Sequence, residues 1–293
     1  MTADKTTAMA EHVLVRGHYG PVWDALRDFL NEDDTVRAHF VCRLWARELP
    51  LDDVDLDSAV WTSCFEAFKY RVTLKSDWFC TYQAIKVGRV DMLRCAHENG
   101  CPWNMSDINN AALYGHLECL KYLHEQGCEW NQWTTASAAA GGHLDCLRYA
   151  HEHGYPWDNW ATTYAAARHD NLTCLKYAHE RGCPLHWGVT MVAAGNGHLR
   201  CLKYAHENGC PWNEEATWET ARGGHLECLK YLHEHGCPWD SRATYAAAEQ
   251  GNLACLKYLH EHGCPWHPET IAIAEHEEHP DCAAYARAHG CPE

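Results

Sequence analysis

Cysteine and histidine recur together along this chain at a spacing that could bind zinc. One stretch carries Cys228, His233 and Cys237, which lie five and then four residues apart. Thiolate and imidazole groups are the ligands that structural zinc prefers, so one hypothesis is a zinc-stabilised repeat protein. The same trio recurs at Cys201, His206 and Cys210 and at Cys255, His260 and Cys264.

Helical geometry argues against zinc. Five residues of α helix turn the chain by about 140°, and the two cysteines of a trio are about 13 Å apart, whereas structural zinc needs four converging ligands. The trio is also incomplete in places, because Tyr155 replaces a cysteine and Arg287 replaces a histidine. We therefore expect no metal and no other cofactor, with the cysteines as small buried hydrophobic side chains and the histidines in a polar ladder.

The chain shows no catalytic motif. The segment His276-Glu277-Glu278-His279 is one residue short of the HExxH pattern, which places two zinc-binding histidines on one helical face. Neither a glycine-rich phosphate loop nor a nucleophile elbow occurs. We expect the protein not to be an enzyme.

The cysteines belong to an internal repeat. Its steps are 27, 28, 27, 27, 27 and 27 residues, a period typical of a solenoid. An earlier copy has Met92 in the cysteine position, so about eight units extend over residues 77–293. The repeated cysteines are Cys119, Cys146, Cys174, Cys201, Cys228, Cys255 and Cys282.

Each unit predicts two helices. An alanine-rich stretch, 241–250, ends at Gly251, and a second stretch, 253–261, has leucines three residues apart, which places them on one helical face. Pro265 then prevents the second helix from continuing. Since neither helix can bury its apolar face alone, the expected fold class is an all-α solenoid of stacked helix pairs.

The second helix carries a resemblance to a known family. The residues from Gly224, Gly-His-Leu-Glu-Cys-Leu-Lys-Tyr-Leu, resemble the Gly-His-Leu-Glu-Val-Val-Lys-Leu-Leu segment of ankyrin repeats. The Thr-Pro-Leu-His opening is absent and the period is shorter than the usual 33 residues, which implies that the hairpin fingers are reduced or absent. Short units with Cys-Pro-Trp are similar to the ankyrin-type arrays that giant viruses of amoebae encode.

The ankyrin resemblance implies a protein-recognition scaffold whose partner binds the concave face formed by the first helices. Polar and aromatic residues on that side differ from unit to unit, as suits partner recognition. Simple packing between repeats is the alternative role for the same side chains. The residues expected to bind a partner are Trp133, Trp160, Tyr164, Trp187, Trp218 and Tyr245.

A different helical pattern precedes the repeats. After a weakly ordered start at 1–15, residues 16–49 show apolar spacing typical of helices, and Val41-Cys42-Arg43-Leu44-Trp45 resembles the Val-Cys-Arg-x-Trp helix of an F-box. An F-box implies docking on the Skp adaptor of a cullin-RING ubiquitin ligase. The alternative is a helical cap on a stand-alone scaffold, and residues 50–76 are expected to be a helical connector. The predicted docking residues are Leu26, Phe29, Leu30, Val41 and Trp45.

Charge and hydropathy exclude other partners. A formal net charge of -16 and a pI near 5.7 disfavour binding to nucleic acid or to anionic membranes. The sequence has no apolar run long enough to span a bilayer and no basic-then-apolar leader at Met1. We expect a monomer with reduced thiols in the cytoplasm, which would be the host cytoplasm if the protein is viral.

Overall fold

The computed structural model describes residues 78–131, 133–155, 157 and 160–292. The chain divides into two units between Lys75 and Ser76, and all of the described residues belong to the second unit. The start at 1–15, the F-box-like segment 16–49 and the connector 50–76 lie outside the described residues. So do the docking residues predicted within the F-box-like segment, Leu26, Phe29, Leu30, Val41 and Trp45.

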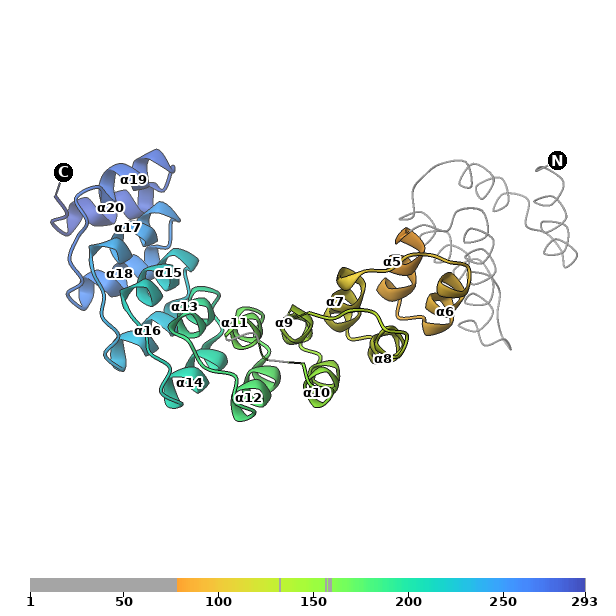
Figure 1. Cartoon of the computed structure of the whole chain (residues 1–293). Helices are drawn as coiled ribbons and strands as arrows, with labels where there is room; N and C mark the ends of the chain where they lie inside the picture. Colours follow the sequence, from red (N-terminus) through yellow and green to blue (C-terminus); the bar gives the residue numbers. More distant parts are fainter. Residues whose placement is uncertain (1–77, 132, 156, 158–159, 293) are drawn as a thin grey trace, which may run out of the picture. The chain divides into compact units, whose positions relative to one another are not determined.

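Sixteen α helices follow one another in the described residues and form eight pairs (Figure 1). The first helices of the pairs are α5 (Trp78–Lys86), α7 (Met105–Tyr114), α9 (Trp133–Gly141), α11 (Ala161–Arg168), α13 (Trp187–Gly195), α15 (Glu214–Gly223), α17 (Ser241–Glu249) and α19 (Thr270–His276). The second helices are α6 (Val90–Glu98), α8 (Leu117–Glu125), α10 (Leu144–Glu152), α12 (Leu172–Glu180), α14 (Leu199–Glu207), α16 (Leu226–Glu234), α18 (Leu253–Glu261) and α20 (Pro280–Ala288).

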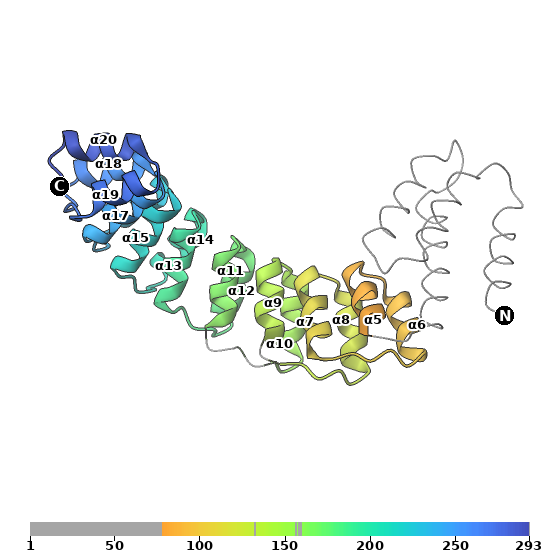
Figure 2. The ribbon, with the colours of Figure 1, turned by 90° about the horizontal axis from the view of Figure 1, so that it is seen from above.

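The pairs stack in sequence order. Each first helix packs on the second helix of its own pair and on the first helix of the next pair, and the second helices contact one another in their own row (Figure 2). The predicted fold class, an all-helical solenoid of stacked helix pairs, is confirmed. Across the described helices and turns no strand occurs, so hairpin fingers are absent there. None of the helices in this part of the chain could cross a membrane.

Small side chains let the first helices approach closely. In α17, Ala243, Ala247 and Ala248 are completely buried, and alanine also has the highest intrinsic helix propensity. The second helices supply the larger apolar groups, such as Leu256 and Leu259 of α18, which are also completely buried. Burying one such leucine contributes about 1.5–3 kcal/mol, so the stability of each pair depends on its neighbours.

A glycine ends α15 beside a side chain of the next repeat. Gly224 has a φ of +73°, which a glycine adopts without steric cost, and the amide of His225 donates to the carbonyl of Thr220 at 3.2 Å. A Cβ atom on Gly224 would lie only 2.5 Å from Oδ1 of Asn252 in the next repeat. Glycine is therefore required both by the backbone conformation and by the neighbouring side chain.

Candidate functional site

The members of each cysteine and histidine trio have separate surroundings. Cys228 is buried in α16, whereas the Nδ1 of His233 lies 2.9 Å from the hydroxyl of Tyr258. The thiol of Cys237 donates to the carbonyl of Asn213 at 3.3 Å. Within the described residues no group of three or more His, Cys, Asp or Glu side chains could hold a metal ion. The zinc alternative therefore gains no support, and the interpretation as buried cysteines with a polar histidine ladder is confirmed.

A histidine–tyrosine ladder links neighbouring second helices. Each bond joins a histidine Nδ1 to the hydroxyl of the tyrosine 25 residues later. The series is interrupted at His151 and Tyr177, which are 26 residues apart because this repeat has one extra residue. Their rings meet edge to face with centroids 6.0 Å apart. The bonded pairs, at 2.9–3.0 Å, are His97–Tyr122, His124–Tyr149, His179–Tyr204, His206–Tyr231, His233–Tyr258 and His260–Tyr285.

Burial sets the protonation of these columns. It lowers the pKa of His206, and the neighbouring imidazole of His235 lowers it further. It also raises the pKa of the Cys119 and Cys237 thiols to about 12. Since only the thiolate is a nucleophile or a metal ligand, these cysteines are chemically inert at neutral pH.

A buried threonine in the first helices forms another ladder. The hydroxyl of Thr217 donates to the carbonyl of Pro238 at 3.0 Å, 21 residues later. Thr163, Thr190 and Thr244 make the equivalent bond to the proline of the following turn. The threonine, tyrosine and cysteine columns thus form a frame that most units share, and other residues vary around it.

The varying residues expected to bind a partner all lie on the first helices or directly before them. We call the solvent-accessible part of α7, α9, α11, α13, α15, α17 and α19, with the residue before and the two residues after each helix, the first-helix face. Trp133, Trp160 and Trp187 are 53%, 43% and 37% exposed. The other three predicted residues, Tyr164, Trp218 and Tyr245, are half-buried.

Part of this set forms one aromatic cluster. Trp160 meets Tyr164 edge to face, with ring centroids 5.3 Å apart, and stacks on His186 at 5.5 Å. His186 lies 5.1 Å from the ring of Trp187. Rings from two consecutive repeats thus join into a single exposed surface, while Trp133 stands one repeat earlier on α9.

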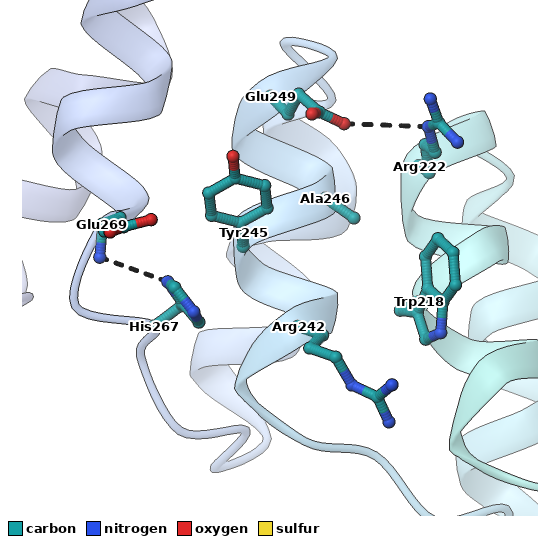
Figure 3. A pocket seen from close by; sticks show the side chains of 8 residues that line it. All are labelled: Trp218, Arg222, Arg242, Tyr245, Ala246, Glu249, His267 and Glu269. Atoms are coloured by element: carbon teal, nitrogen blue, oxygen red, sulfur yellow. Dashed lines mark hydrogen bonds and ion pairs between the residues drawn. The ribbon is translucent and has the colours of Figure 1, made fainter.

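Trp218 and Tyr245 line a groove of about 410 Å³ between α15, α17 and the turn before α19 (Figure 3). The indole Nε1 of Trp218 is buried and has no hydrogen-bond partner among the described residues, and its ring packs on the core. Tyr245 lies across from His267 with ring centroids 5.0 Å apart. The complete lining is Trp218, Arg222, Arg242, Tyr245, Ala246, Glu249, His267 and Glu269.

Ion pairs fix the walls of the groove. Arg222 reaches Glu249 of the next repeat at 3.7 Å, and Arg242 reaches back to Glu214 at 3.4 Å (Figure 3 shows the first pair). The prediction missed Arg222, Glu249 and the turn residues of the lining. Arg222 and Glu249 share one column of the repeat with Arg168, Gly195 and Ala140, and nothing in that column signals a groove.

Comparison with known proteins supports the repeat type. Residues 190–270 match the family model for ankyrin repeats, in three copies. This part of the chain is similar to ankyrin repeats, which are protein-interaction modules. The match contains all the groove residues, Trp218 and Tyr245 among them, whereas the residues of the aromatic cluster precede it.

One solved structure of an ankyrin repeat domain is similar to part of this chain. The crystal structure of the human ASB11 ankyrin repeat domain has 19% sequence identity, covers 58% of this chain and 96% of that domain, and gives a TM-score of 0.47. No curated protein sequence matches this chain.

Proposed function

We propose that this protein is a protein-protein interaction scaffold that binds its partner through the first-helix face. The supporting observation is the contrast between a frame that most units share and exposed tryptophans that only some units carry. Exposed tryptophans provide large contact areas with few rotatable bonds, as is typical of binding hot spots. The contact residues are then Trp133, Trp160, Tyr164, Trp187, Trp218 and Tyr245.

A peptide-binding experiment tests this proposal. Peptides selected from a random display library on the full chain should lose about tenfold or more in affinity for the Trp160→Ala/Trp187→Ala variant. A matched control is Lys176→Ala/Lys203→Ala, which removes two long side chains from equivalent places on the second helices α12 and α14. If both variants bind the peptides as wild type does, the first-helix face is not the contact surface.

We also propose that residues 16–49 act as an F-box-like segment, which would make the protein a substrate-recruiting adaptor of a cullin-RING ubiquitin ligase. The support is the resemblance of Val41 to Trp45, with the repeats then selecting the target in the cytoplasm of the cell, or of the host if the chain is viral. Wild type should co-purify with the Skp adaptor, and Leu26→Ala/Trp45→Ala should not. Absence of binding by wild type would leave a stand-alone scaffold.

A further inference from the structure

The first-helix face changes in chemical character along its length. Within the described residues, all of the exposed large hydrophobic side chains lie on α7, α9 and α13 or directly before α11. With the residue before and the two residues after each of these helices included, the Asp, Glu, Lys and Arg residues there are Asp107, which is buried in the cap of α7, Arg168 and Asp170. This half of the face is therefore apolar and nearly uncharged. The exposed hydrophobic residues are Met105, Leu113, Trp133, Trp160 and Trp187.

The following half is acidic. Segments 213–224, 240–250 and 269–278 contain nine carboxylates against two arginines. Both arginines are already paired, Arg242 with Asp240 and Glu214 and Arg222 with Glu249. Six carboxylates therefore remain without an arginine of this face: Glu215, Glu219, Glu269, Glu275, Glu277 and Glu278.

Among the described residues only one of these six pairs with an arginine from outside this face, and Glu277 lies 2.8 Å from the Nδ1 of His276. Arg287 of α20 pairs with Glu275. Glu269, Glu277 and Glu278 are solvent-exposed, and Glu269 lines the groove beside Tyr245. An excess of accessible negative charge thus begins one helix after the exposed tryptophans and extends to the end of the row.

We infer that the partner presents a polypeptide segment with an aromatic or large aliphatic anchor at one end and a cluster of lysines or arginines at the other. The anchor binds the tryptophans of α9 to α13, and the basic cluster faces the carboxylates of α15 to α19. Complementary charge speeds encounter and excludes acidic competitors. The inference rests on the proposed function, since it assumes that the first-helix face is the contact surface.

The geometry also predicts the spacing within that segment. Packed helices lie about 8–10 Å apart, and the acidic helices are one to three positions beyond α13. The anchor and the basic cluster should thus be about 10–30 Å apart, which an extended chain spans with about three to nine residues.

The experiment is a selection on the immobilised full chain from a random library of peptides of about 16 residues, which span about 50 Å when extended. The expected peptides contain a Trp, Phe or Leu separated by about three to nine residues from at least a pair of Lys or Arg. Their affinity should fall about tenfold or more in Glu215→Lys/Glu269→Lys/Glu277→Lys, and it should weaken when NaCl rises from about 50 to about 300 mM.

The control variant makes the same charge change on the second helices, Glu207→Lys/Glu234→Lys/Glu261→Lys, whose carboxylates are all exposed. It should retain most of the affinity. The corresponding glutamine triple at 215, 269 and 277 is the second variant if the lysine triple melts at a lower temperature. Two results would overturn this inference and leave the proposed function standing. In the first, the selected peptides lose affinity for Trp160→Ala/Trp187→Ala but carry no basic cluster. In the second, they bind the first-helix and second-helix lysine variants equally well. Peptides indifferent to the tryptophans would overturn the proposed function as well.

Discussion

At the scale of single residues, the alignment of neighbouring repeats depends on a few hydrogen-bonding groups within an otherwise apolar interface. The hydroxyl of Tyr258 meets the Nδ1 of His233 at 2.9 Å, and the same histidine ring stacks on Trp239 with centroids 4.1 Å apart. A hydrogen bond between partly buried groups contributes about 0.5–1.5 kcal/mol net. Repeated along the row, such bonds favour one register of stacking over its alternatives.

Removing one ladder hydroxyl tests this. Tyr258→Phe should lower the melting temperature by about 2–4 °C, as expected for about 1 kcal/mol in a domain of this size. Tyr177→Phe is the matched control, because the Tyr177 ring touches His151 without the hydroxyl bond. Thermal unfolding followed by circular dichroism distinguishes them, and equal shifts would show that the hydroxyl bond is not the stabilising feature.

The same histidines make stability depend on pH. Burial and then the neighbouring imidazoles of His235 and His262 lower the pKa of His206 and His233, against weaker opposite effects of Glu207 and Glu234. The unfolded chain therefore binds more protons just below a pH of about 6.5, so stability falls as the pH decreases through that value.

Melting temperatures between pH 7.5 and 5.5 should show this fall. In His206→Gln/His233→Gln the dependence should be weaker, whereas the exposed His169→Gln should keep the slope of wild type. A double variant with an unchanged slope would refute the assignment to these two rings.

At the scale of helices, each repeat completes the first helix of the repeat before it. The side-chain amide of Asn252 donates to the carbonyls of Ala221 and Arg222 at 3.0 and 2.7 Å, in the last turn of α15, where carbonyls lack a partner further along the helix. In another pair the Nε2 of His198 lies 2.9 Å from the carbonyl of Arg168. Asparagine and histidine thus perform the same task at this position.

If asparagine and histidine are equivalent before the second helix, substitutions of Asn252 should show it. Asn252→Ala removes two bonds to a helix terminus and should destabilise the array by about 1–2 kcal/mol, whereas Asn252→His should recover most of the loss. Urea unfolding of both variants measures the difference. A histidine variant as unstable as the alanine variant would contradict the capping role.

Much of this frame could be predicted from the sequence. Gly251 and Pro265 mark helix ends, because glycine adopts the positive φ found after a helix and proline cannot continue one. The 27-residue period fixes which residues share a column. The tyrosine partner of His233 was harder to predict, because it belongs to the next repeat. The groove was not predictable, since Trp218, Arg242 and the turn before α19 meet only once three repeats are stacked.

At the scale of the whole array, we expect packing between neighbouring repeats, and not a metal, to be the source of stability. A zinc-stabilised array would contain at least one zinc per chain and would melt earlier with a chelator. We expect elemental analysis of the purified protein to find less than one zinc per chain, and EDTA to leave the melting temperature unchanged. A stoichiometric metal content would restore the zinc hypothesis.

The array also separates frame from recognition. Residues that hold the repeats together recur in most units, so exposed residues of the first helices can change without loss of the fold. The aromatic cluster and the groove lie in consecutive pairs of this row, so one extended partner could contact both.

The central claim is that a partner binds the first-helix face. Hydrogen exchange of the full chain, with and without a tightly bound peptide from the selection, tests it most directly. We predict added protection in α11, α13, α15 and α17, with little change in α12, α14, α16 and α18. Protection concentrated in the second helices would contradict binding at the first-helix face.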